Sequence, residues 1–511
     1  MSFQSILFER FEEGQNGETL KEAPPFFRDL NLDQIVDAIT AGRQEYDLKP
    51  FFYTRLTDLA VIAYRHEIMR DLENEALLQS IQSFSGQMRA MRERLTLVKK
   101  LSYKYQKERW LLDAVETYGE AVENLRDDLR RANPNSHGLL AFREYLAQYA
   151  ESGQFKTLLE EATTLISELT AIRYCLLIKG SSITVRNYDA EIDYSAAVEE
   201  TFSKFKRSAV KDCRVKFPDF GMNHVEARVL DLVAQLNPAI FLALDDYCAR
   251  NGNYLDRTIA DFDREIQFYI AYLEFAETFK RAGLKFCYPK VSETTKDVGN
   301  REGFDLALAG KLIRESSVVV CNDFFLSGEE RIFVVTGTNQ GGKTTFARTF
   351  GQLHYMASLG CPVPGTEAQL FLFDRLFTHF EKEENLKTLR GKLQDDLVRI
   401  HHILDQATPN SVIIMNEIFS STTLNDAAFL SKEVMERISK LDCLSICVTF
   451  LDELSSLNEK TVSVVAMMAP DNPTLRTHRI ERRRADGLSY ALAIAEKYGL
   501  TYNRLKERIK Q

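Results

Sequence analysis

The most constraining feature of this chain is a glycine-rich stretch, GTNQGGKT, at residues 337–344. It follows a short apolar and mostly β-branched run at residues 332–335, and its spacing fits the pattern G-x-x-x-x-G-K-[ST]. In that pattern the glycines let successive backbone N–H groups curl around phosphates, Lys343 reaches the terminal oxygens, and Thr344 can ligate Mg²⁺. Residues 345–356 can form a helix whose N-terminal dipole favours the same anion. The sequence therefore predicts a nucleoside triphosphate site between a strand and a helix, with ATP as the expected nucleotide.

A second apolar run, residues 412–415, ends in the polar pair Asn416-Glu417. A strand that stops in this way has the form of a Walker B element, whose carboxylate polarises the water that attacks the terminal phosphate, so Glu417 is the candidate base. Asn416 stands where an aspartate normally holds hydrated Mg²⁺, and an amide keeps the hydrogen bonds but loses the negative charge. The alternative is a strand end capped by polar residues without a catalytic role.

Apolar, β-rich runs alternate with helical segments throughout the C-terminal half. The runs are residues 332–335, 412–415, 444–449 and 462–469. This alternation predicts an α/β domain built on a largely parallel sheet. The turn-like sequence that begins at Cys287 marks the expected boundary, which gives a helical region at 1–290 and an α/β domain at 291–511.

The helical region shows a coiled-coil-like seam. Thr57 is the expected N-cap of its first long helical stretch. Apolar residues then recur at alternating spacings of four and three. They are Leu111, Val115, Tyr118, Val122, Leu125 and Leu129, then Leu139, Phe142, Leu146 and Tyr149, and later Phe262, Ile266, Tyr269, Leu273 and Ala276. Long helices that leave and return around an insertion predict a lever arm, and the plainer alternative is a helical-bundle core.

The insertion, near residues 175–216, carries a strand–turn–strand signal around Gly180. A first basic cluster follows this signal at residues 204–214. A second basic run, residues 89–109, holds eight positive and two acidic side chains with Tyr103 and Tyr105 interleaved. Charge runs are usually solvated faces, and contact with nucleic-acid phosphates is the sharper interpretation. The hairpin favours the first cluster, whose candidate DNA-binding residues are Lys204, Lys206, Arg207, Lys211 and Arg214.

Composition limits the partners and the compartment. Sixty-five basic and 74 acidic residues give a net charge of −9, so nucleic-acid contact must come from local patches. No apolar run approaches the length of a membrane span, and the first residues lack the order of a signal peptide, so no membrane association is expected. The eight cysteines lack metal or disulfide spacing, which predicts reduced core thiols in a cytoplasmic protein and no metal other than Mg²⁺.

With these residues in view, the C-terminal half resembles the ATPase domain of the MutS family, whose members are ABC-type P-loop ATPases. The matching segments are TGTNQGGKTT, MASLGCPVPG, FDRLFTHF, IIMNEIFSSTTLNDA and GLSYALAIAEKYGL. The helical region resembles the family's core and lever, with residues 175–216 in the place of its DNA-gripping clamp. The resemblance thus implies an ABC-type ATPase domain at the C-terminus, preceded by an all-α core and lever with a small clamp-like insertion.

The resemblance also implies roles for single residues. Nucleotide would be bound by Asn322, Gly337, Thr338, Asn339, Gln340, Gly341, Gly342, Lys343, Thr344 and Thr345. Mg²⁺ would be held by Thr344 and Asn416, catalysis would rest on Glu417 and Lys343, and the dimer interface would include Gly391 and Asp426.

Some positions depart from the family's pattern. Val319 replaces an adenine-stacking aromatic residue, Gly391 a serine that reaches across the dimer, Asn416 the Walker B aspartate, and Phe450 a histidine that senses the γ-phosphate. The resemblance therefore implies ATP binding with slow hydrolysis.

Two functions fit these expectations. The first is a dimeric, ATP-dependent DNA-binding ATPase of mismatch-repair or recombination type that acts on duplex or branched DNA. The core-like sequence begins within the first few tens of residues, so we expect a shortened relative without mismatch-reading and connector domains. The alternative is a slow or inactive nucleotide-binding scaffold that acts through protein partners.

Overall fold

The computed structural model describes residues 3–9, 20–189, 198, 201, 222–381, 391–469, 472–485, 501–502 and 505–506. The chain divides into two compact units. One consists of residues 1–3, 74–134 and 139–263, and the other of residues 4–73, 135–138 and 264–511. The expected boundary near residue 290 stays a prediction, because a compact unit and a family's module are different ways to divide a chain.

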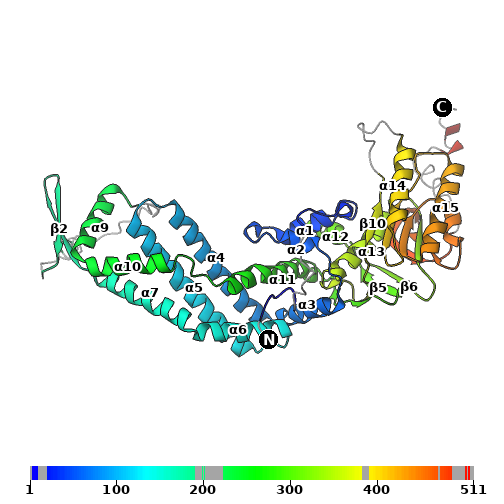
Figure 1. Ribbon diagram of the computed structural model, residues 1–511. Coiled ribbons are helices and arrows are strands. Elements are labelled where there is room, and N and C mark those ends of the chain that lie inside the picture. Colours follow the sequence, from blue (N-terminus) through cyan, green and yellow to red (C-terminus); the bar gives the residue numbers. More distant parts are fainter. Residues whose placement is uncertain are drawn as a thin grey trace. The chain divides into compact units, whose positions relative to one another are not determined.

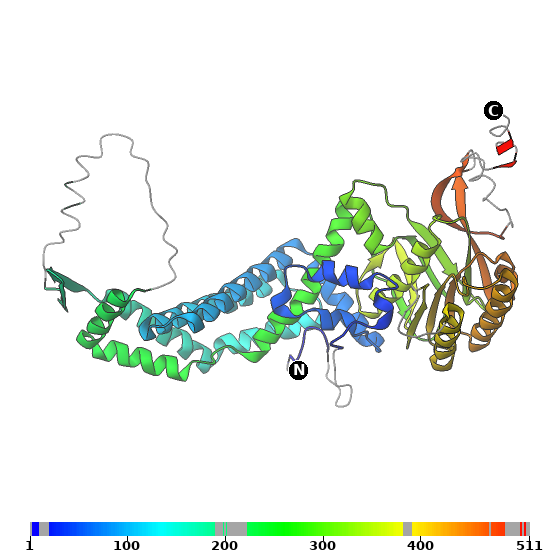
Figure 2. The same cartoon turned by 90° about the horizontal axis from the view of Figure 1, so that it is seen from above.

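The first unit is built from long helices that follow the apolar seam. Its helices are α4 (Glu75–Lys100), α5 (Lys104–Ala132), most of α6 (His137–Glu151), α7 (Gly153–Ala171), α9 (His224–Leu236), α10 (Pro238–Arg250) and the start of α11 (Arg257–Arg281). Helices α4 and α5 lie side by side along their length (Figures 1 and 2). The seam residues Val115 to Leu129 on α5 are buried, and Phe142 on α6 stacks on Phe262 of α11 with 3.5 Å between ring centroids. The outgoing and returning helices therefore share one core, as the seam predicts.

A hairpin adjoins helix α9 within this unit (Figure 1). Strands β1 (Tyr174–Lys179) and β2 (Ser182–Asn187) pair antiparallel through a turn in which Gly180 has φ +61°. The expected strand–turn–strand is thus confirmed. Its interpretation as a clamp stays a prediction, because the candidate DNA-binding residues Lys204, Lys206, Arg207, Lys211 and Arg214 lie outside the described residues.

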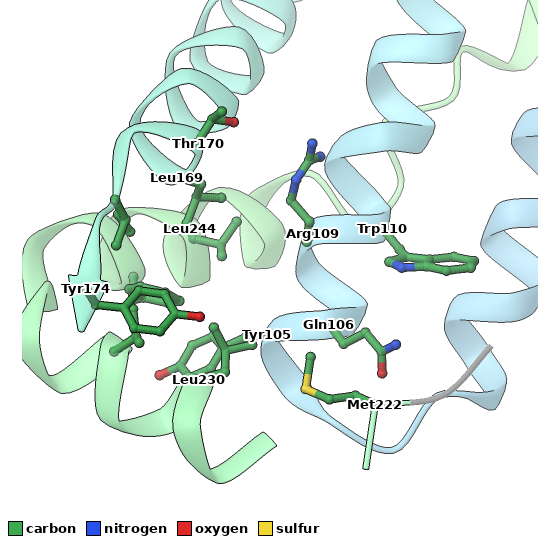
Figure 3. Close-up of a pocket in the computed structure, with 13 residues that line it drawn as sticks. Tyr105, Gln106, Arg109, Trp110, Leu169, Thr170, Tyr174, Met222, Leu230 and Leu244 are labelled. Carbon is green, nitrogen blue, oxygen red and sulfur yellow. The ribbon is translucent and has the colours of Figure 1, made fainter. Parts of the chain in front are cut away.

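Next to the hairpin, a cavity of about 400 Å³ opens among α5, α7, α9 and α10 (Figure 3). Its lining includes Tyr105 and Trp110 from α5, Tyr174 from β1 and Phe241 from α10. The rings of Tyr105 and Phe241 meet edge to face at 4.8 Å. Trp110 is the only tryptophan of the chain, so it is a built-in fluorescent reporter for this part of the helical unit.

Three of the eight cations in the second basic run form ion pairs within the unit. Arg92 pairs with Asp263, and Lys104 lies 2.5 Å from a carboxylate oxygen of Asp245. Arg109 pairs with Asp113 one helical turn away. These contacts favour a structural role for the three cations, and a DNA contact by this run stays a prediction.

The second unit joins N-terminal helices to the α/β domain. The helices are α1 (Leu32–Thr40), α2 (Lys49–Tyr53) and α3 (Leu59–Leu72). The N-cap of α3 is Asp58, whose carboxylate accepts a 2.7 Å hydrogen bond from the Ala60 backbone N–H. The prediction of Thr57 as this cap is wrong by one residue, because the carboxylate of Asp58 reaches the unpaired N–H group of the first turn.

A six-stranded sheet forms the core of the α/β domain. Its order is β10 (Leu376–His379), β11 (Val412–Asn416), β12 (Leu444–Val448), β7 (Ile332–Gly337), β13 (Thr461–Ala469) and β14 (Asn472–Arg482). Every pairing is parallel except that of β14 with β13. The largely parallel sheet and its four predicted strands are therefore confirmed, and β10 and β14 are additions that the apolar runs do not indicate.

Helices cover both faces of this sheet, which explains the uninterrupted apolar runs. Phe333 on β7 packs edge to face on Phe346 of α13 (Lys343–Ser358). Its neighbour Val334 joins a separate core with Ile403 of α14 (Lys392–Gln406) and Met435 of α15 (Leu424–Leu441). Consecutive residues of one strand thus point to opposite apolar layers.

A second, mixed sheet that the sequence did not predict lies beside the first. It has the order β4 (Lys290–Ser292), β9 (Glu367–Phe371), β5 (Val298–Gly303) and β6 (Asn322–Leu326). Strands β3 (Phe286–Cys287) and β8 (Val363–Pro364) form a separate pair, and α12 (Leu306–Arg314) follows β5. The strands of this sheet are short and each contains polar residues, so no long apolar run marks them.

The described cysteines are free thiols; Cys361, Cys443 and Cys447 are buried in the core as predicted, whereas the other four are only partly buried. Burial raises the pKa of the Cys443 and Cys447 thiols to about 12. Across the described residues, no single helix is long and apolar enough to cross a membrane. Helices α9 and α10 satisfy length and composition only as a pair, which is bent by 107°.

Candidate nucleotide-binding site

The glycine-rich loop connects the end of β7 to the start of α13, as the sequence predicts. Gly337 and Gly342 have φ angles of +111° and +99°, which L side chains rarely adopt. A Cβ on Gly337 would lie 3.0 Å from the backbone nitrogen of Ala466, and one on Gly341 would lie 2.9 Å from the Cβ of Ala466. The loop therefore follows β13 so closely that only glycine fits at these positions.

Lys343 is the first residue of α13 and points back into the loop. Its Nζ donates a 2.7 Å hydrogen bond to the Gly337 carbonyl oxygen and lies 4.3 Å from the ring centroid of Phe450. Burial lowers the pKa of Lys343, while the nearby carboxylates of Glu417 and Asp452 act to raise it. The helix N-terminus and this ammonium together form a positive end that suits an anion.

Thr344 and Asn416 connect the first turn of α13 to the end of β11. The Thr344 hydroxyl donates to Asn416 Oδ1 at 2.9 Å. A hydroxyl and an amide oxygen are hard ligands that Mg²⁺ accepts, although this pair has no negative charge of its own. The chemistry of these two oxygens therefore suits a Mg²⁺ ion.

Glu417 follows β11 directly and has a left-handed backbone with φ +55°. Its backbone N–H donates to the Val448 carbonyl at 2.9 Å, which fixes the turn against β12. Burial raises the pKa of Glu417, Lys343 acts to lower it, and Glu381 raises it further. Because β7 and β11 are both parallel to β12, their carboxyl ends meet at one edge, which brings the candidate base to the loop.

Asn322 sits on β6 with its amide engaged by β14. Its Nδ2 donates to the His478 carbonyl at 3.1 Å, and its Oδ1 accepts from the Ile480 N–H at 2.7 Å. Arg476, which is also on β14, donates a 2.9 Å hydrogen bond to the Gln340 side chain of the loop. Asn322 thus holds β14 beside the loop, and direct contact of Asn322 with a nucleotide stays a prediction.

The remaining predicted loop residues are close to these groups. The Thr338 hydroxyl lies 3.3 Å from the sulfur of Met468 on β13, and the carbonyl of Thr345 accepts from the Thr349 hydroxyl at 2.9 Å. Asn339 and Gln340 are exposed at the tip of the loop. Their side chains are therefore accessible to a ligand.

The predicted dimer-interface residues begin two helices of the same domain. Gly391 is the N-cap of α14, and a Cβ there would meet no atom within 4 Å. Asp426 lies in the first turn of α15, where its carboxylate accepts a 2.8 Å hydrogen bond from the N-cap Thr423. Both residues are exposed, and their role in a dimer stays a prediction.

The structure brings three further side chains to this site, and of these only the position of Phe450 was indicated by the resemblance. Phe450 and Asp452 come from the loop after β12 and approach Lys343. Glu381, at the end of β10, pairs with Lys392 and accepts a 3.3 Å hydrogen bond from Ser420. Because these residues come from loops, only the path of the chain after each strand brings them to the site.

Residues 333–508 match the family model described as MutS domain V. A DNA mismatch repair protein MutS of Fervidobacterium nodosum is 29% identical over 198 residues, which cover 38% of this chain and 24% of the relative. The corresponding protein of Chloroflexus aurantiacus is 30% identical over 193 residues, or 36% and 20% of the two chains. That of Shouchella clausii is 27% identical over 263 residues, or 48% and 30%. The chain therefore spans less than a third of the length of these curated relatives. The match to the family model, residues 333–508, covers the loop, Glu417 and Phe450.

Proposed function

We propose that this chain, a MutS-family protein by its residues 333–508, binds ATP with Mg²⁺ and hydrolyses it slowly to control binding to DNA. The observation that carries this proposal is the meeting of Lys343, the Thr344–Asn416 pair and Glu417 at one edge of a parallel sheet. The carboxyl edge of such a sheet is where α/β domains generally bind ligands.

Each residue has a distinct task in this proposal. The N–H groups of residues 337–344 and the Lys343 ammonium would hold the phosphates and stabilise the charge that develops on them. Glu417 would orient and polarise the attacking water, and its raised pKa makes its carboxylate a better proton acceptor. Thr344 and Asn416 would hold Mg²⁺, which neutralises phosphate charge when it is bound.

DNA is the proposed partner because the relatives are named DNA mismatch repair proteins. In this chain we place the DNA contacts on the helical unit, beyond the β1–β2 hairpin, at the basic residues 204–214. We further propose a homodimer with Gly391 and Asp426 at its interface. ATP could shift such a dimer between two arrangements only if it binds one of them more tightly.

A second candidate function is a nucleotide-binding scaffold with little or no turnover. Asn416 provides no negative charge for Mg²⁺, and the Phe450 ring lies over the ammonium that would contact phosphate. These features slow hydrolysis without preventing binding. Such a protein would act through the partners that it holds in its ATP-bound form.

ATP turnover by the purified full chain separates the two functions. The assay is run without DNA and with duplex, mismatched and branched DNA, on the wild type and the Lys343→Ala variant. Turnover that DNA stimulates and that Lys343→Ala abolishes supports the ATPase. Tight ATP binding without turnover on any DNA contradicts the ATPase and supports the scaffold.

A further inference from the structure

The candidate phosphate-binding cation is in contact with an aromatic ring. Lys343 is 4% exposed, whereas Phe450, whose ring lies 4.3 Å from the Lys343 Nζ, is 52% exposed. The same Nζ donates to the Gly337 carbonyl at 2.7 Å. Two electron-rich but uncharged groups therefore stabilise the ammonium before any phosphate arrives.

The ring is held at this place by its backbone. The Thr449 N–H donates to the Val335 carbonyl of β7 at 3.1 Å, and the Leu451 N–H donates to the Thr449 hydroxyl at 3.0 Å. These bonds fix the chain immediately before and after Phe450 against the strand that leads into the loop. The ring can leave the ammonium by side-chain rotation, while its Cα stays in place.

We propose that Phe450 is a positioning residue that holds Lys343 in a nucleotide-free arrangement and so weakens the binding of a nucleoside triphosphate. This inference rests on the proposed function, because it takes the loop as the phosphate site. To reach phosphate oxygens, the Lys343 ammonium must exchange the Gly337 carbonyl and the ring for them. Any stabilisation that the ring gives to the free protein alone is subtracted from the affinity for the triphosphate.

The size of the effect follows from the strength of such contacts. A cation over an aromatic face contributes an amount equivalent to about twofold at an exposed site and about thirtyfold at a desolvated one. Lys343 is buried while the ring is half exposed, so the effect falls between these limits. If the ring instead stayed over the ammonium in the complex, it would shield the phosphate contact from water, and its removal would weaken binding.

The test is a calorimetric titration of the full chain with MgATP. Phe450→Leu keeps an apolar side chain but removes the π face, so we expect ATP affinity to rise between twofold and thirtyfold. Phe450→Tyr keeps the face, and we expect its affinity to stay within about twofold of the wild type. The matched control is Phe325→Leu on β6, because Phe325 is 53% exposed and lies under the Arg482 guanidinium at 4.5 Å. This control should leave ATP affinity unchanged.

A gain in affinity separates positioning from a structural role, because a damaged fold would lower affinity. Equal or weaker binding by Phe450→Leu, with ATP bound by the wild type, overturns the inference and leaves the proposed function standing. An equal gain in Phe325→Leu overturns it as well. If neither the wild type nor any variant binds ATP, the proposed function fails. Binding by Phe450→Leu alone would support both.

Discussion

At one edge of the six-stranded sheet a carboxylate is paired with several cations of the chain, whereas at the other edge a buried cation contacts a carbonyl and an aromatic ring, with the carboxylates of Glu417 and Asp452 nearby. Asp442, before β12, accepts hydrogen bonds from Lys460 at 2.7 Å and Lys296 at 3.1 Å, and Arg331 lies 3.2 Å away. Although burial acts to raise the pKa of Asp442, these cations hold it at about 2. At the carboxyl edge, Lys343 meets a carbonyl and a ring instead.

The difference separates a structural charge cluster from a binding site. Arg331 precedes β7, Lys460 precedes β13, and Lys296 lies in the loop between β4 and β5. Their ion pairs with Asp442 therefore hold the amino ends of these strands together. At the other edge, the loop, the helix N-terminus and Lys343 leave positive charge that a phosphate would neutralise. The predictions below test this contrast; the first has the largest expected effect and the last the smallest.

The strongest test of the carboxyl edge is Glu417→Gln. If Glu417 is the base, ATP turnover falls by about 10²- to 10⁴-fold, because the amide cannot accept the proton, while ATP affinity stays near that of the wild type. Steady-state turnover and a binding titration measure the two effects separately. Asp452→Asn, which also changes a carboxylate near Lys343, should reduce turnover much less. Unchanged turnover in Glu417→Gln would remove the base from the account.

At the amino edge, Asp442→Ala should lower the free energy of unfolding without a direct effect on ATP affinity. Removal of the carboxylate leaves Lys296 and Arg331, whose side chains are 13% and 11% exposed, without their shared anion. Because the Asp442 side chain is itself 34% exposed, solvent screening limits the expected loss to about 1–2 kcal/mol.

Urea unfolding of Asp442→Ala measures this loss. The control is Glu277→Ala, which breaks an exposed pair with Arg281 and should change stability by less than about 0.5 kcal/mol. Equal losses in both variants would show that the amino edge is an ordinary charged surface.

The structure also predicts a pH dependence of folding stability, which arises first from a histidine on α13 and at lower pH from Asp442. His354 is fully buried, and burial lowers its pKa to about 4 although its hydrogen bond to the Phe350 carbonyl acts in the opposite direction. Its neutral form therefore stabilises the fold fully above the unfolded-state pKa of about 6.5, and this stability is lost as pH falls through about 4. The Asp442 contribution is lost only at lower pH, between about 4 and 2.

Urea unfolding at pH 7 and pH 4.5 measures the first of these losses. We expect the wild type to lose about 2 kcal/mol from this group and the His354→Gln variant to lose correspondingly less. The comparison uses the change in the free energy of unfolding between the two pH values. A packing defect in the variant that is the same at both pH values therefore cancels. Equal losses in both proteins would contradict the role of His354.

The smallest effect is expected for Gly391→Ser. A Cβ at this position meets no atom within 4 Å, and the φ angle of −67° suits any residue, so stability should change by less than about 0.5 kcal/mol. If Gly391 lies at the dimer interface, as proposed, a serine hydroxyl there would reach across the dimer, add a hydrogen bond and raise turnover severalfold. Turnover is measured above and below the dimerisation concentration, and a rise that does not depend on concentration would contradict the interface role.

Much of the carboxyl edge could be predicted from sequence because its chemistry is local. The loop and the pair Asn416-Glu417 each follow an uninterrupted apolar run, which is typical of a strand buried on both faces. Strand β14 escaped prediction because its sequence is rich in arginine and pairs at the sheet edge. The resemblance indicated that Phe450 stands where the family senses the γ-phosphate, but its contact with Lys343 depends on the path of the chain after β12 and was not predicted.

The charge cluster at the amino edge could not be predicted from the sequence for a related reason. Lys296, Arg331, Asp442 and Lys460 are separated by up to 164 positions and share no motif. Arg331, Asp442 and Lys460 precede β7, β12 and β13, which start at the same edge of the sheet, and Lys296 reaches them from the loop between β4 and β5. Local motifs thus predicted which groups lie together at the carboxyl edge, and the fold was needed to find the groups that hold the strands together.

The central claim is that the carboxyl edge, and not the amino edge, binds nucleotide. Calorimetric titration of MgATP into the wild type, Lys343→Ala and Lys296→Ala tests it most directly, because each variant removes one cation from one edge. The account predicts that Lys343→Ala abolishes measurable binding and that folded Lys296→Ala binds ATP as the wild type does. Retained binding in Lys343→Ala, or loss of binding only in Lys296→Ala, would contradict the account.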